Sequence, residues 1–475
     1  MELHIVFEGR KGLAQQLYAQ LHAAIREGRL PDGTQLPPTR LLAEQLGVSR
    51  KTVADAYAQL GYSGLLEGQV GRGSFVKVPP AAAPTPRAAQ ALSGQPRLAW
   101  WQRLQVPLRH PDHAGRLRYE FMGGAVMKQH FPLDAWRQCM QAALRQMSEA
   151  RGFYGDPQGV AALRAAVAGH AAFARGVRCT ANDVLVCNGA QQALDLLARL
   201  LIEPGCRVAM EDPGYTPARL LFESLGASVV GVPVDAEGLC TEQVPEDARL
   251  VYVTPSHQMP LGMPMSPARR RALLALAEAR GMLIIEDDYD SEFRYEGPAL
   301  ESLQSQDTAG VVAYVGTFSK TVLPELRLGY LVLPPLLMEP AIKARQLMDW
   351  HSNSLLQWAL ARFIEAGHLQ RHIRRCHGIY ASRRARILAR AHSDLAPWLE
   401  PVPAQAGFHL ALLLRDRRDA GALASAARAE GLGLYPLAGF YHQAPARQGL
   451  LMGFGSIERL DIDPALNILQ QLLAR

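Results

Sequence analysis

The stretch of this sequence that is best suited to covalent chemistry surrounds a lysine. Lys320 follows the apolar run 311–315 and the hydroxyl residues Thr317 and Ser319, and Arg327 comes seven residues later. A lysine amine kept away from water can form a Schiff base with a carbonyl group, and a nearby arginine can hold a phosphate. Because a single lysine is usually a solvated surface charge, this interpretation needs support from other segments.

An acidic cluster follows another apolar run, at 283–285. Asp287 and Tyr289 lie there, at the expected carboxyl end of a strand, where open α/β sheets bind their ligands. A carboxylate in that position needs a partner, and the protonated ring nitrogen of pyridoxal phosphate is one. We expect Asp287 to hold that nitrogen and Tyr289 to donate a hydrogen bond to the ring's 3-oxygen. The plainer alternative is an acidic loop that caps the next helix.

Two more segments carry residues suited to such a ligand. Gly189, Ala190 and Gln191 follow the apolar run 184–186 and open a helix, whose free N–H groups can hold a phosphate. Tyr215, in an Asp-Pro-Gly-Tyr sequence, would stack its ring on a flat ligand. Alone, each segment is weak evidence, because helix starts and core tyrosines are common.

These segments need a frame that brings them together. Apolar runs alternate with Ala- and Leu-rich helical stretches, which is typical of βαβ units around a mostly parallel sheet. The runs lie at 184–186, 207–210, 250–253, 282–285 and 311–315. The sequence therefore predicts an α/β fold for the larger part of the chain.

Residues 119–475 resemble the fold-type-I aminotransferases, which bind pyridoxal 5′-phosphate. The resemblance rests on chain order: a phosphate-type helix start, Pro-x-Tyr, Asp-x-Tyr, then Ser-Lys with its later Arg. It implies that Lys320 is the Schiff-base lysine and that Asp287, Tyr289 and Tyr215 contact the cofactor ring. The residues that it implies for the phosphate and its surroundings are Gly189, Ala190, Gln191, Thr317, Ser319 and Arg327.

One departure from that family pattern concerns the ring's 3-oxygen. The Asn-Pro-x-Gly loop of the family corresponds to residues 254–262, where Met259 stands in place of the asparagine. Either His257 or Gln258 would substitute for it.

A second departure concerns the ligand carboxylate. The family usually binds it with an arginine near the C-terminus, which the segment 450–455 lacks. Arg447 and Arg219 are the nearby candidates for binding an effector.

The first eighty residues carry an unrelated motif. Apolar residues at helical spacing predict a helix from Leu13 to Ile25, and the segment 37–46 predicts a short second one. Gly47 separates this second helix from a third that Ser49 caps, which makes a helix-turn-helix. The residues expected to contact DNA from these helices are Arg40, Ser49, Arg50, Lys51 and Thr52. The alternative is a solvated helical face.

A glycine-flanked basic tip completes this motif. Arg72 lies between Gly71 and Gly73, and the apolar segments on either side predict two paired strands that form a wing. The ordered series through Arg72 resembles the winged helix-turn-helix of GntR-type regulators. The resemblance implies that Arg40 is a phosphate clamp and that Arg72 reaches an adjacent groove.

Charge and composition separate the two motifs. Residues 1–80 carry nine Lys and Arg against seven Asp and Glu, and residues 81–118 carry six Arg against Asp112 alone. This basic excess favours a polyanionic partner. Seven prolines between 79 and 111 indicate a semi-extended linker. We therefore predict a DNA-binding domain at 1–78, a linker at 79–118 and a cofactor domain at 119–475.

Several classes of protein are disfavoured. No apolar run approaches the ~20 residues of a transmembrane helix, and the first ten residues carry charges where a signal peptide would be apolar. The six cysteines include no Cys-x-x-Cys pair, and no histidine cluster has zinc spacing, so we expect reduced thiols and no metal site. These features predict a cytoplasmic protein that does not bind membranes.

As a whole, the chain resembles the MocR family of transcription regulators. The resemblance implies that the aminotransferase-like domain is a sensor rather than an enzyme, although slow residual transamination is compatible with it. It also implies binding to double-stranded operator DNA, control by an amino-compound effector or by pyridoxal phosphate itself, and a head-to-tail homodimer. The alternatives are an active aminotransferase with an appended DNA-binding domain, and a body that binds no cofactor and only dimerises.

Overall fold

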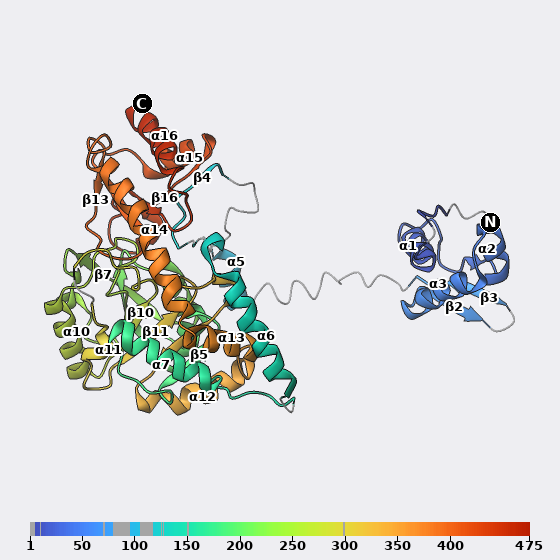
Figure 1. Cartoon of the computed structure of the whole chain (residues 1–475), viewed down its shortest axis with the longest axis horizontal. Helices are drawn as coiled ribbons and strands as arrows, with labels where there is room; N and C mark the ends of the chain where they lie inside the picture. Colours follow the sequence, from blue (N-terminus) through green and yellow to red (C-terminus); the bar gives the residue numbers. More distant parts are fainter. Residues whose placement is uncertain are drawn as a thin grey trace. The chain divides into compact units, whose positions relative to one another are not determined.

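The structure is a computed structural model, and it describes residues 5–9, 11–69, 72–78, 96–104, 117–124, 126, 128–149, 152–297 and 300–475. The chain divides into two compact units, an N-terminal unit (Met1–Leu108) and a body (Arg109–Arg475) (Figure 1). Gly71 and most of the predicted linker, at 79–95 and 105–116, lie outside the described residues. Another part of that linker is a helix, α5 (Pro96–Arg103), where the proline content predicts an extended chain. Residues 97–103 of this helix contain no proline, and a proline in the first turn is compatible with a helix.

The N-terminal unit contains the predicted helices, α1 (Leu13–Arg26), α2 (Thr39–Leu46) and α3 (Arg50–Tyr62). Gly47 ends α2 in the left-handed conformation, with φ 63°. The Ser49 hydroxyl accepts a hydrogen bond from the Thr52 N–H and so begins α3. The apolar stripes of the three helices form the core of the unit, with Leu17, Leu21, Ile25, Leu42, Val53, Ala56, Tyr57 and Leu60 all buried.

The predicted wing is also present. Strands β2 (Leu66–Gln69) and β3 (Gly73–Val76) pair antiparallel, and a two-residue strand that the sequence does not reveal, β1 (Gln35–Leu36), pairs with β3. The Gln35 side-chain amide donates to the Arg72 carbonyl oxygen at 2.6 Å. This bond fixes the basic tip to the strand that precedes α2.

The body is built on an eight-stranded sheet in the order β5-β12-β11-β10-β9-β6-β7-β8. Its strands are β5 (Val184–Cys187), β6 (Arg207–Asp212), β7 (Ser228–Asp235), β8 (Gly238–Leu239), β9 (Leu250–Val253), β10 (Leu283–Asp288), β11 (Val312–Thr317) and β12 (Gly329–Val332). The five strands β11, β10, β9, β6 and β7 are parallel, whereas β12 runs antiparallel to both its neighbours. The prediction of a mostly parallel sheet is confirmed.

Helices cover both faces of this sheet, because neighbouring strand residues point to opposite sides. In β9, Tyr252 packs into one apolar cluster, whereas Val251 and Val253 pack into another. The helices around the sheet are α6 (Leu133–Glu149), α7 (Ala161–Arg175), α8 (Ala190–Leu201), α9 (Thr216–Ser224), α10 (Pro267–Arg280), α11 (Leu303–Gln306), α12 (Pro335–Asp349) and α13 (Ser354–Glu365).

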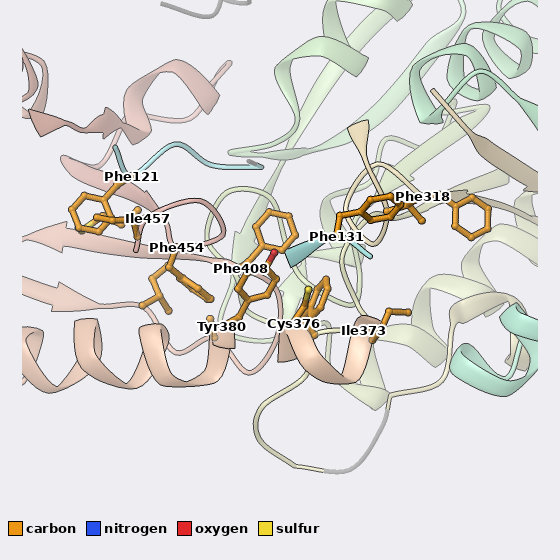
Figure 2. Packing of buried hydrophobic residues seen from close by; sticks show 14 of the residues in the cluster. Phe121, Phe131, Phe318, Ile373, Cys376, Tyr380, Phe408, Phe454 and Ile457 are labelled. Atoms are coloured by element: carbon orange, nitrogen blue, oxygen red, sulfur yellow. The ribbon is translucent and has the colours of Figure 1, made fainter. Parts of the chain in front are cut away.

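The C-terminal part of the body has a smaller antiparallel sheet of β13 (Leu399–Pro401), β14 (His409–Leu414), β17 (Gly449–Gly453) and β16 (Tyr435–Pro436). The helices α14 (His368–Ala391), α15 (Ala420–Ala429) and α16 (Ile462–Ala474) belong to this part. Figure 2 shows Tyr380 of α14 beside Phe408 and Phe454, with Cys376 and Ile373 further along the same helix. This aromatic core joins the smaller sheet to the long helix.

A third sheet joins the two ends of the body. Strand β4 (Tyr119–Glu120) pairs in parallel with β15 (Leu432–Gly433). The Phe121 carbonyl oxygen then accepts a hydrogen bond from the Gly453 N–H, at the end of β17. The first described residues of the body therefore belong to its C-terminal part.

Among the described residues, no helix is both long and apolar enough to span a bilayer.

Candidate functional site

Lys320 lies just beyond the end of β11, in a largely enclosed position. Its Nζ donates a hydrogen bond to the Gly124 carbonyl oxygen at 2.7 Å and lies 5.8 Å from the centroid of the Phe408 ring. Burial lowers the pKa of Lys320; the carboxylates of Asp290 and Asp287 oppose this shift. The amine therefore gives up its proton more readily than a surface lysine, as a nucleophile must.

Asp287 is the next-to-last residue of β10, and its side chain is buried within electrostatic reach of Lys320. Its Oδ2 accepts a hydrogen bond from the Tyr252 hydroxyl at 2.7 Å, but its Oδ1 is buried without a partner. Burial raises the pKa of Asp287 to about 6. A buried carboxylate oxygen without a donor is costly, so this atom is suited to a ligand N–H.

The start of α8 forms a cradle for an anion. Gly189 precedes the helix with φ 82°, and a Cβ there would come within 2.8 Å of the Arg327 guanidinium. Arg327 itself has φ 50°, a strained conformation for a residue other than glycine, and donates to the Asn188 carbonyl oxygen at 3.1 Å. The Arg327 guanidinium therefore lies beside the free N–H groups at the start of α8, and both can donate hydrogen bonds to a phosphate.

The remaining residues expected around the phosphate divide into two groups. Ala190 is the first residue of α8, and the buried Thr317 accepts a hydrogen bond from the Ser319 N–H at 3.1 Å. Gln191 is exposed on α8, whereas the next residue, Gln192, turns back to accept from the Asn188 N–H at 2.7 Å. Gln191 is therefore the weakest member of the predicted set.

Tyr215 precedes α9 and is within electrostatic reach of Asp287 and Arg327. Burial raises its pKa to about 12, so its hydroxyl stays protonated. The structure thus brings Tyr215, Asp287, Lys320 and Arg327 to one place from four segments, as the sequence predicts. This grouping can hold a flat, anionic, carbonyl-bearing ligand.

The loop in which Met259 replaces the asparagine of the family is closed by Gln258. The Gln258 side-chain amide donates to the carbonyl oxygens of Pro213 and Met259, both at 2.8 Å, and accepts from the Leu261 N–H at 2.9 Å. Since these bonds occupy the amide, Gln258 shapes the loop. His257 instead contacts Asp290, with 2.9 Å between Nδ1 and the carboxylate.

Several residues at this site have no signal in the sequence. Tyr252 lies inside a predicted strand, and nothing local marks it as a partner of Asp287. Glu211 is buried on β6, where burial raises its pKa to about 7 although it accepts hydrogen bonds from Thr254.

The structure also brings together two histidines and one aspartate that could hold a metal ion, although the sequence predicts no metal site. His257, Asp290 and His409 place one possible ligand atom each within 4.8 Å of one another. Sequence spacing could not reveal this group, because its members come from three distant segments.

The two arginines proposed for an effector differ in their surroundings. Arg219 pairs with Glu223 at 3.0 Å and lines a small pocket together with Tyr215 and His442. Arg447 is exposed. Arg219 is thus beside the site, although its charge is already partly balanced.

The predicted DNA contacts lie on the surface of the N-terminal unit. Arg40 in α2, Arg50 and Lys51 in α3, and Arg72 at the wing are exposed. Ser49 and Thr52 are engaged in the cap of α3, where their hydroxyl groups lie 2.8 Å apart. Helices α2 and α3 and the wing therefore present basic side chains in the arrangement used to bind a DNA groove.

Two family models match the chain. Residues 13–76 match the bacterial regulatory proteins of the gntR family, and residues 125–447 match aminotransferase class I and II. The matches cover the N-terminal unit and the body separately. Aminotransferase domains of this class use pyridoxal phosphate, which is therefore the cofactor of the body.

Relatives and solved structures agree with these matches. The chain is 36% identical to the probable rhizopine catabolism regulatory protein MocR of Rhizobium meliloti, over 96% of this chain and 92% of that protein. It is 35% identical to the transcriptional regulator TauR of Rhodobacter capsulatus, over 93% and 92% of the two chains. The kynurenine aminotransferase of Pyrococcus horikoshii shares the fold of the body, with a TM-score of 0.75 and 24% identity over 82% of this chain and 98% of that one.

The residues of the site fit pyridoxal phosphate. The unpartnered Oδ1 of Asp287 suits the ring N–H, and the cradle at Gly189 would be filled by any Cβ. The enclosed Lys320 amine would be available to the aldehyde. Sequence, fold and site thus agree, and the chain belongs to the MocR family of GntR-type transcriptional regulators, in which a winged helix-turn-helix domain is fused to an aminotransferase-like domain.

Proposed function

We propose that this regulator senses pyridoxal phosphate, or an amino compound that reacts with it, and changes the affinity of its N-terminal unit for operator DNA. One observation carries the proposal: Lys320, with a lowered pKa, shares a site with the unpartnered Asp287 oxygen, in a chain that also carries a winged helix-turn-helix. The body would act in the cytoplasm as a sensor, and catalysis would be secondary.

The site residues have separate tasks in this proposal. Lys320 would bond the cofactor, Asp287 would keep a proton on the ring nitrogen, and Tyr215 would cover the ring. The N–H groups at the start of α8 and the Arg327 guanidinium would hold the phosphate. When bound, the cofactor supplies an aldehyde carbon that reacts reversibly with amines.

An effector amine would compete with Lys320 for that carbon. Lys320 would then be a free amine, and its Nζ could donate a hydrogen bond to the Gly124 carbonyl oxygen. The loop that carries Tyr215 is joined to the C-terminal part, because the Asp212 carboxylate accepts hydrogen bonds from the N–H groups of His442, Gln443 and Ala444. A ligand that binds two arrangements of these parts unequally shifts their populations, by ~1.4 kcal/mol for a tenfold preference.

An exposed apolar patch on the body supports the proposed homodimer. Phe153, Tyr154, Leu347 and Trp350 have 84%, 74%, 89% and 52% of their surfaces exposed. The rings of Tyr154 and Trp350 lie 4.5 Å apart. Exposed aromatic groups of this kind are typical of protein interfaces, so we propose that a second copy covers them, in the head-to-tail arrangement implied by the family.

Cofactor is expected to change the affinity of the full chain for its operator about tenfold, since that is the scale of ordinary allosteric coupling. Titration of operator DNA by fluorescence anisotropy, with and without pyridoxal phosphate, measures this change. Pyridoxine phosphate, which has no aldehyde, is the matched control and should have little effect. Equal affinity and equal transcription in all three conditions would contradict the sensor proposal.

Replacing Arg50 or Arg40 with alanine is expected to weaken DNA binding roughly tenfold or more, since a charge-assisted hydrogen bond contributes about 1.5–3 kcal/mol. The slope of log affinity against log salt should also fall by about one, as the loss of one phosphate contact requires. Arg29→Ala removes an exposed arginine that pairs with Glu27 and should leave both quantities unchanged. If Arg50→Ala and Arg29→Ala behave alike, α3 is not the DNA-contacting helix.

The completeness of the Lys320 site also supports a second candidate function, amino-group transfer between an amino acid and a keto acid. Steady-state turnover of about 1 per second or faster would favour this alternative. Turnover far below that rate, together with cofactor-dependent DNA binding, would favour the sensor.

A further inference from the structure

A row of three side chains, two of them buried and the third half-buried, runs from Asp290 through His257 to Tyr289. His257 Nδ1 lies 2.9 and 3.0 Å from the two carboxylate oxygens of Asp290 and 3.1 Å from the Tyr289 hydroxyl oxygen. His257 and Asp290 are each only 1% exposed. The Tyr289 hydroxyl also donates to the His257 carbonyl oxygen at 2.9 Å. The row is therefore a connected network beside Lys320.

The position of the imidazole proton follows from the partners of the ring. His257 Nε2 is buried and has no hydrogen-bond partner among the described residues, so a proton there would have no acceptor. An ionised carboxylate only accepts, so the proton belongs on Nδ1, which donates to Asp290. With Nδ1 protonated, the Tyr289 hydroxyl cannot donate to it. Its proton goes to the His257 carbonyl oxygen or to a ligand.

The surroundings keep this arrangement fixed. The His409 ring lies 4.2 Å from the His257 ring, centroid to centroid. A Cβ on Gly407 would overlap His257 and Asp290, and one on Gly262 would lie 3.2 Å from His257 Nε2. The imidazole is therefore clamped, and it cannot rotate to present Nε2 to Asp290 without displacing its neighbours.

We propose that Asp290 and His257 are positioning residues that hold the Tyr289 hydroxyl as a donor to the 3-oxygen of the cofactor. The inference rests on the proposed function, because it requires the cofactor to bind beside Lys320. It assigns His257 a task behind Tyr289 rather than direct contact with the ring, and it adds Asp290, which no sequence pattern marks. An asparagine is then unnecessary at position 259, because the Tyr289 hydroxyl, held by His257 and Asp290, is the donor to the 3-oxygen.

Charged and titratable groups face the row from several elements. They are Asp287 and Asp288 on β10, Glu211 on β6, Lys320 after β11, His409 on β14 and Arg384 on α14. Burial raises the pKa of Asp290 to about 7, against the effects of His409 and Lys320. When Asp290 takes up a proton it would donate to Nδ1, and the histidine would lose the tautomer that directs Tyr289. The directing effect is thus present when Asp290 is ionised and is lost as the pH falls through about 7.

The test compares variants of the full chain by cofactor affinity and by the pH midpoint of the visible absorbance. Tyr289→Phe, His257→Leu and Asp290→Ala should each weaken cofactor binding about tenfold, the usual loss for a hydrogen bond to a charged group. Each should raise the pH midpoint by about one unit, because a donor stabilises negative charge on the 3-oxygen. His257→Asn, which retains an N–H near the position of Nδ1, should restore most of both quantities.

Non-additivity separates positioning from general damage. In a Tyr289→Phe background, His257→Leu should have no further effect on either readout, since the hydroxyl that it positions is already absent. His372→Leu removes another buried histidine of the body, beside Cys376, and should leave both readouts unchanged. Thermal unfolding and circular dichroism establish that the compared variants are folded.

The outcomes distinguish this inference from the proposed function. If wild-type protein binds no cofactor, the proposed function fails. If wild-type protein binds it and His257→Leu retains wild-type affinity and pH midpoint, or if the His257→Leu and Tyr289→Phe effects add fully, only the positioning inference is overturned. One equivalent of bound transition metal that is lost in His409→Ala would also overturn it, because His257, Asp290 and His409 would then be metal ligands.

Discussion

Lys320→Ala is expected to abolish covalent attachment of pyridoxal phosphate and the visible absorbance that accompanies it. No other amine can take the place of Nζ without losing the position set by the Gly124 carbonyl oxygen and the Phe408 ring. The full-length variant should still bind operator DNA through its N-terminal unit, but its affinity should no longer respond to cofactor. Absorbance spectra and DNA titrations of the same preparation measure both effects.

The site of attachment can be checked directly. Borohydride reduction followed by peptide mass spectrometry should find the cofactor on Lys320 in the wild-type protein and on no residue in the variant. Lys343→Ala is the matched control, because Lys343 is exposed and pairs with Glu339 on α12. Retention of reducible cofactor in Lys320→Ala would move the attachment point to another lysine and remove the basis of the sensor proposal.

Asp287→Ala is expected to weaken cofactor binding by roughly 30- to 5000-fold, because breaking a buried charge pair costs about 2–5 kcal/mol. The variant removes the only group among the described residues that we assign to the ring nitrogen. Equilibrium dialysis against pyridoxal phosphate measures the loss. Asp287→Asn keeps an acceptor for the Tyr252 hydroxyl but removes the charge, and it should show most of the same loss.

The pH dependence provides a second check on Asp287. Burial raises its pKa to about 6 in the free protein, so the carboxylate that accepts from the ring N–H is present above that pH. Cofactor affinity should therefore fall as the pH drops through about 6, and Asp287→Asn should lack this step. Wild-type affinity in Asp287→Ala, or the same pH step in Asp287→Asn, would contradict the assignment to the ring nitrogen.

The helix-turn-helix could be predicted because its boundaries depend on single residues. The left-handed Gly47 ends α2 and the Ser49 hydroxyl begins α3. The contacts of both residues are with neighbours a few positions away in the sequence, so they can be read from the local pattern. Strand β7 was harder to predict, because Gly231 and Pro233 interrupt its apolar pattern. It forms because β6 pairs with it along its length, which is a long-range effect.

The same contrast holds within the site. Lys320, Asp287 and Tyr215 each end or follow an apolar run, so their convergence follows from the geometry of a parallel sheet. Asp290 and His409 could not be found this way, because their roles depend on a contact between the large sheet and β14. The sequence left His257 and Gln258 as equal alternatives, and they separated only when the hydrogen bonds of the Gln258 amide were known.

The pairing of β4 with β15 has a mechanical consequence. Residues 119–124 begin where the chain enters the body, pass through a strand bonded to the C-terminal part, and end at the carbonyl oxygen that accepts from Lys320. The reactive amine is thus one hydrogen bond away from the segment with which the body begins, and that segment is itself paired with the C-terminal part. A change in what the amine binds would therefore act first on residues 119–124, without passing through the large sheet.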